Sequence, residues 1–150
     1  MIKKIPFGFP LIDKAEKLEI RKVLAGYILA HGPRTKRFEK EFCNFTKAPH
    51  AISVSSCTTG MHLVYEALNI SRGDEVLVPA QTHVATAHAI EHAGAKPIFI
   101  DCDYKTGNID PKKIEQKITK KTKAITVVHF LGLPVEFFEI KKIAKKYNLK

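Results

Sequence analysis

The chain has 150 residues, of which 45% are hydrophobic and 27% are charged, a composition typical of one globular domain with its own core. Its three cysteines lie far apart and form no CxxC pair, which argues against a disulfide framework and against a zinc site: Cys43, Cys57 and Cys102. No apolar run approaches the length needed to cross a membrane, and the first residues lack the apolar core of a signal peptide, so we expect a cytoplasmic protein with no membrane partner.

The formal net charge is +10, and most of it lies toward the end of the sequence. Residues 111–150 contain eleven lysines against three glutamates, so this stretch supplies +8 of the +10. These lysines fall mostly on the polar faces of two expected helices, with no interleaved aromatic residues and no recognition motif. Solvated helix faces explain the charge better than a nucleic-acid patch, and acidic residues in sequence not shown here are a third explanation. We expect no nucleic-acid partner.

Two helices are predicted before residue 50. The first covers residues 11–26, where Asp13 and Glu16 have the spacing of a capping box. After a break at Gly32-Pro33, the second covers residues 36–46. Three aromatic residues of this second helix follow the i, i+4, i+7 spacing of one buried stripe: Phe38, Phe42 and Phe45.

From residue 51 onward, short apolar strands alternate with helices. We expect strands at 51–54, 75–78, 96–100 and 123–128, and helices at 58–69, 82–92 (capped by Thr82), from Asp110-Pro111 onward, and at 136–147. Strands that are almost wholly apolar indicate a parallel sheet covered by helices on both faces. The sequence therefore predicts the α/β class.

The last expected helix ends near Tyr147, with Asn148 as a plausible C-cap. In a succession of strands and helices, another strand is expected after a helix at this point. We therefore expect this sequence to be the first part of a longer protein.

The segment 54–63 passes from the expected strand into the expected helix through small and hydroxyl-bearing residues. The first N–H groups of a helix have no partner inside the helix, and the helix dipole favours an anion there. The hydroxyl groups of Ser56, Thr58 and Thr59 are further donors to phosphate oxygens. Serine and threonine also cap helices that bind no ligand, so these residues alone leave both interpretations open.

An ordered set of motifs resembles the DegT/DnrJ/EryC/StrS-type sugar aminotransferases, which depend on pyridoxal phosphate. The resemblance covers nearly the whole chain, in order and at fitting intervals. The segments that carry it are 32–33, 38–39, 55–63, 73–79, 82–86, 94–101, 118–125, 128–129 and 132–134.

This resemblance implies part of the large domain of a type I, aspartate-aminotransferase-like fold. Residues 1–34 are then an N-terminal helical segment, and residues 35–150 are the first part of the domain that binds pyridoxal 5'-phosphate. It also implies that the Cys57 N–H and the Thr58 hydroxyl hold the cofactor phosphate, and that His83 lies over the pyridine ring. Cysteine stands here where the family has glycine or alanine, a modest departure.

The implied reaction moves an amino group from glutamate to a keto group of a nucleotide-activated sugar, for polysaccharide, lipopolysaccharide or amino-sugar biosynthesis. The family implies a homodimer. It also requires a Schiff-base lysine and an aspartate on the pyridinium nitrogen, and the resemblance places both beyond Lys150. We therefore assign no catalytic residue within this chain and expect these 150 residues alone to be inactive.

Two alternatives remain. Some family members replace the Schiff-base lysine with histidine and act as sugar dehydratases. A non-catalytic α/β nucleotide-binding module is the other alternative, although the sequence lacks both GxGxxG and GxxxxGK[ST]. His88 and His92 stand four residues apart on an expected helix, but without a third ligand we expect no metal site.

Overall fold

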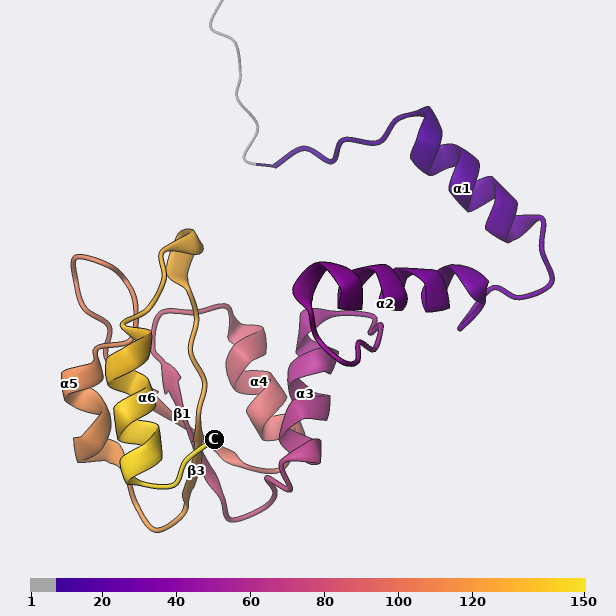
Figure 1. The fold of residues 1–150 in the computed structure, drawn as a ribbon. Helices are drawn as coiled ribbons and strands as arrows, with labels where there is room; N and C mark the ends of the chain where they lie inside the picture. Colours follow the sequence, from indigo (N-terminus) through magenta and orange to yellow (C-terminus); the bar gives the residue numbers. More distant parts are fainter. Residues whose placement is uncertain (1–7) are drawn as a thin grey trace, which may run out of the picture. The chain divides into compact units, whose positions relative to one another are not determined.

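The computed structural model describes residues 8–150, which form two compact units, one ending at Ser53 and one spanning Val54–Lys150 (Figure 1). The predicted division into residues 1–34 and 35–150 concerns the domains of a longer fold, and it stays a prediction. No helix within residues 8–150 is both long enough and apolar enough to cross a lipid bilayer.

The first unit contains two helices, α1 (Lys14–Leu24) and α2 (Pro33–Thr46), within its described residues. At the start of α1, the Ala15 N–H donates to the Asp13 carboxylate at 2.7 Å. The Asp13 N–H donates to the Glu16 carboxylate at 2.8 Å, which confirms the predicted capping box. α2 begins at Pro33 rather than at residue 36, because proline suits the first helical position, where its missing N–H would have no partner.

The aromatic stripe of α2 is exposed, so the predicted burial is wrong in this structure. Its side chains are 59%, 48% and 84% exposed: Phe38, Phe42 and Phe45. The rings of Phe38 and Phe42 have their centroids 6.1 Å apart. The described residues of this unit form only two helices, so no further layer of secondary structure covers the stripe.

The second unit, described in full, is built on three strands: β1 (Glu75–Pro79), β2 (Lys96–Ile100) and β3 (Thr122–Ile125). They lie in the order β2-β1-β3, and both pairings are parallel. Leu77 of β1 lies opposite Ile98 of β2 and Ile125 of β3. Leu77 and its neighbours Val76 and Val78 are fully buried, as expected of a central strand covered on both faces.

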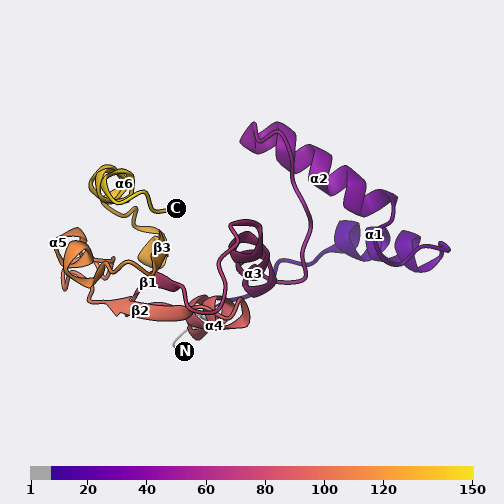
Figure 2. The same cartoon turned by 90° about the horizontal axis from the view of Figure 1, so that it is seen from below.

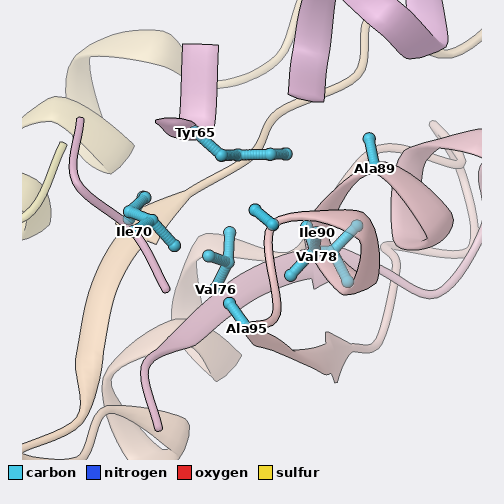
Figure 3. Packing of buried hydrophobic residues seen from close by; sticks show 9 residues of the cluster. Tyr65, Ile70, Val76, Val78, Ala89, Ile90 and Ala95 are labelled. Atoms are coloured by element: carbon cyan, nitrogen blue, oxygen red, sulfur yellow. The ribbon is translucent and has the colours of Figure 1, made fainter. Parts of the chain in front are cut away.

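Helices cover both faces of this sheet (Figure 2). The covering elements are α3 (Cys57–Ala67) and α4 (Val84–His92) on one face, and α5 (Pro111–Ile114), the 3-10 turn η1 (Glu115–Lys117) and α6 (Phe137–Lys146) on the other. Val76 and Val78 pack in a cluster with Tyr65 of α3 (Figure 3). Leu77 packs on the opposite face in a cluster with Ile140 of α6. The predicted α/β class, with helices on both faces of a parallel sheet, is confirmed.

The strand predicted over residues 51–54 does not form. No strand of the described residues pairs with this segment, and the Ser53 N–H instead donates to the Glu39 carboxylate at 2.8 Å. A strand needs a neighbour for its backbone groups, and apolar composition alone supplies none. β3 likewise ends at Ile125 rather than at residue 128.

A buried asparagine holds the segment that follows β3. Asn108 is 5% exposed, and its Nδ2 donates to the carbonyl oxygens of Leu133 and Pro134 at 3.0 and 3.1 Å. Its Oδ1 accepts from the Phe130 N–H at 2.9 Å. The neighbouring Gly107 has a φ of 71°, and a Cβ there would lie 2.5 Å from the Phe130 ring. The turn η2 (Phe130–Gly132) is therefore fixed by contacts with the segment that follows β2.

Replacing Asn108 by alanine is expected to lower the free energy of unfolding by about 1 to 3 kcal/mol, because one donor and two acceptors of the backbone lose their partner. Urea unfolding followed by circular dichroism measures this change. Gln116→Ala removes an exposed amide with no hydrogen bond among the described residues and is the control. Equal stability of the two variants would contradict the assigned role of Asn108.

Candidate functional site

The residue before α3 is a serine that caps the start of the helix. Ser56 has extended backbone angles, φ −160° and ψ 162°, and its Oγ accepts from the Thr59 N–H at 3.1 Å. The Thr59 hydroxyl lies 3.0 Å from the Ser56 Oγ and 3.2 Å from the Ser55 Oγ. Ser56 and Thr59 thus cap the start of the helix, a role that the sequence alone left open.

The two residues between them keep their donors free. Among the described residues, no acceptor is bonded to the N–H groups of Cys57 and Thr58, and the Thr58 hydroxyl makes no hydrogen bond. Cys57 is exposed and Thr58 is half-buried. Two free N–H groups and one hydroxyl at the positive end of a helix dipole form an arrangement that suits a phosphate group.

The N-cap of α4 is His83 rather than Thr82, so the predicted N-cap is wrong by one residue. The His83 Nδ1 accepts from the Ala85 N–H at 3.1 Å. The Thr82 hydroxyl is bonded instead to the Thr86 hydroxyl, at 2.8 Å. The imidazole of His83 is exposed and held at the helix end.

The sheet topology brings these two helix ends to one edge. α4 follows β1 and leads back to the parallel strand β2, so its first residue lies beyond the carboxyl end of β1. α3 leads toward the amino end of β1, and Figure 1 shows the first turns of α3 and α4 at the same edge of the sheet. In open α/β sheets, ligands bind beyond the carboxyl ends of the strands. The residues predicted from sequence, Cys57, Thr58 and His83, therefore share the edge at which a ligand is expected.

A groove elsewhere in the second unit is a poorer candidate for an anion. It has a volume of about 660 Å³ and lies beside α5 and α6, away from the first turns of α3 and α4. Its lining includes five carboxylates, which would repel a phosphate: Asp103, Asp110, Glu115, Glu136 and Glu139.

The structure adds a third histidine to the pair seen in the sequence. The ring centroids of His88 and His92 lie 6.5 Å apart, and the ring of His62 on α3 lies 5.8 Å from that of His92. His62 also lies 3.4 Å from the Glu66 carboxylate. In the part of the chain that the structure describes, no three His, Cys, Asp or Glu side chains are placed to hold a metal ion.

Comparison with known proteins agrees with the family resemblance seen in the sequence. Residues 10–150 match the model of the DegT/DnrJ/EryC1/StrS aminotransferase family. The spore coat polysaccharide biosynthesis protein SpsC of Bacillus subtilis (strain 168) is 41% identical over 145 residues, which are 97% of this chain and 37% of SpsC. The chain thus spans little more than a third of that relative.

Two solved structures have a closely similar fold. The putative sugar aminotransferase Spr1654 from Streptococcus pneumoniae, in its PLP-form, is 33% identical with a TM-score of 0.92, covering 97% of this chain and 37% of the other. NtdA from Bacillus subtilis, with bound cofactor PMP, is 35% identical with a TM-score of 0.87, covering 100% of this chain and 36% of the other. With 141 of its 150 residues matched, the chain belongs to the DegT/DnrJ/EryC1/StrS aminotransferase family.

Proposed function

We propose that the protein to which this chain belongs is a pyridoxal-phosphate-dependent aminotransferase that transfers an amino group from glutamate to a nucleotide-activated keto sugar. The observation that carries the proposal is the start of α3, where two N–H groups and a hydroxyl are free at the carboxyl edge of the sheet. The name of SpsC supports a role in polysaccharide biosynthesis, and the PLP-form of Spr1654 supports the cofactor.

The residues of the first turn of α3 fit a phosphate. The N–H groups of Cys57 and Thr58 and the Thr58 hydroxyl would donate to its oxygens, while Ser56 and Thr59 keep the turn in shape. The cysteine at position 57 is compatible with this role because its backbone donates and its side chain is small. Pyridoxal phosphate, when bound, supplies the electron sink of the reaction.

His83 would hold the pyridine ring in place. Its Nδ1 is fixed by the Ala85 N–H, so the imidazole is oriented before any ligand arrives. An oriented aromatic ring gives stacking area at little entropic cost. We further propose that residues beyond Lys150 supply the Schiff-base lysine and the carboxylate on the pyridinium nitrogen, and that the protein acts as a cytoplasmic homodimer.

The proposal is tested with the longest protein that the gene encodes, purified and loaded with pyridoxal phosphate. Glutamate should convert the bound cofactor to pyridoxamine phosphate, which absorbance spectroscopy follows, with release of 2-oxoglutarate. A keto sugar nucleotide should then return the cofactor to its aldehyde form. A protein that binds the cofactor but does not respond to glutamate or to other amino donors would overturn the assignment as an aminotransferase.

Cys57 offers a test of the backbone donor, because it is the first residue of α3 and proline is tolerated at that position. Cys57→Pro removes only one N–H from the site, whereas Cys57→Ala keeps it. We expect the Kd for pyridoxal phosphate to rise roughly 10-fold or more in the proline variant, as for a lost hydrogen bond to a charged group, and to stay near the native value in the alanine variant. Fluorescence titration measures both values, and equal affinity in the two variants would exclude the Cys57 N–H as a phosphate donor.

Two substitutions separate the two roles of His83, helix capping and ring stacking. His83→Phe keeps an aromatic ring but removes the cap, whereas His83→Asn keeps a capping side chain but removes the ring. We expect the asparagine variant to bind the cofactor roughly 3- to 10-fold more weakly, because the stacking contact is lost, with its thermal stability retained. The phenylalanine variant should bind the cofactor with near-native affinity but have a lower thermal stability. Native affinity in the asparagine variant would argue against stacking.

A further inference from the structure

One partly buried polar contact joins α3 to the residue that follows β3. The hydroxyl groups of Tyr65 and Thr126 lie 2.6 Å apart, although the residues are 61 positions apart in sequence. Tyr65 lies on α3 and is 5% exposed, within the cluster formed with Ile70, Val76 and Val78 (Figure 3). The Tyr65 hydroxyl is therefore the polar tip of a side chain that is otherwise surrounded by apolar groups.

The partner of Tyr65 is itself fixed to the sheet. Thr126 directly follows β3, and its N–H donates to the Leu77 carbonyl of β1 at 2.8 Å. The Tyr65 hydroxyl is thereby connected, through one threonine, to the two strands β1 and β3. Among the described residues, this is the one side-chain hydrogen bond between α3 and the sheet or the residues that follow its strands.

The rest of the contact between α3 and the sheet is apolar, and apolar contact is not directional. It holds the helix against the sheet without fixing how far the helix slides or turns. A hydrogen bond is directional and does fix such a position, because displacement separates the two groups from each other. Burial also raises the pKa of the Tyr65 phenol, so the hydroxyl remains protonated and able to donate.

We propose that Tyr65 and Thr126 are a positioning pair, which sets where the first turn of α3 stands relative to the carboxyl ends of β1 and β3. The pair does not touch the phosphate. It acts through the helix, by holding the N–H groups of Cys57 and Thr58 at the position where a phosphate bound across this edge meets them. This inference rests on the proposed function, because it assigns the pair to the phosphate end of pyridoxal phosphate.

The test compares pyridoxal phosphate with pyridoxal, which lacks the phosphate, as ligands of the full-length protein. Tyr65→Phe and Thr126→Val each remove one hydroxyl and keep most of the side-chain volume. We expect either variant to raise the Kd for pyridoxal phosphate by about 5-fold, with the Kd for pyridoxal changed less than about 2-fold. The double variant should bind pyridoxal phosphate no more weakly than either single variant. Thr126→Ser keeps the hydroxyl, so it should keep the native ratio of the two affinities.

Asn108→Ala is the matched control, since it removes buried hydrogen bonds on the other side of the same sheet. It should lower the melting temperature as the Tyr65 variant does while leaving the ratio of the two affinities unchanged. A native ratio in both Tyr65→Phe and Thr126→Val would overturn the positioning role and leave only a stabilising one. Failure of the native protein to bind pyridoxal phosphate would instead count against the proposed function, which separates the two results.

Discussion

The backbone of β1 is paired along both edges and its side chains are buried on both faces, so the elements before and after it have little freedom in direction. α3 has to bring the chain to the amino end of β1, and α4 has to take it back from the carboxyl end. Both helices therefore begin at the same edge. The position of β1 thus brings the first turns of two helices to one edge, and with them the free N–H groups of Cys57 and Thr58 in α3.

The strongest sequence signals were those with a local cause. The capping box at Asp13 and the proline after Asp110 depend on neighbours within four residues, and both are found in the structure. The apolar run of β1 is also a clear signal, because a strand buried on both faces carries apolar side chains on both. The segment 51–54 has the same composition, yet it forms no strand, because pairing depends on a partner that composition does not reveal.

The candidate site shows a similar limit at the level of atoms. The sequence presents four neighbouring hydroxyl groups at residues 55, 56, 58 and 59, and any of them is chemically able to cap the helix or to meet an anion. Which one does so depends on backbone angles and rotamers. Ser56 stands in extended conformation before the first turn, so its hydroxyl reaches Thr59, whereas Thr58 lies inside the turn and is left free. Likewise His83, not Thr82, reaches the Ala85 N–H.

Free donors are tolerated at this position because water reaches them. Cys57 is exposed, so its N–H is not a buried unsatisfied group and costs the fold little until a ligand covers it. A phosphate that displaces this water replaces its hydrogen bonds with stronger, charge-assisted ones. The Ser56 cap is important for the same reason. It satisfies the Thr59 N–H and so leaves the N–H groups of Cys57 and Thr58 as the unpaired donors of the first turn. In the proposed site, helix stability and anion binding would thus use different donors of one turn, so that neither excludes the other.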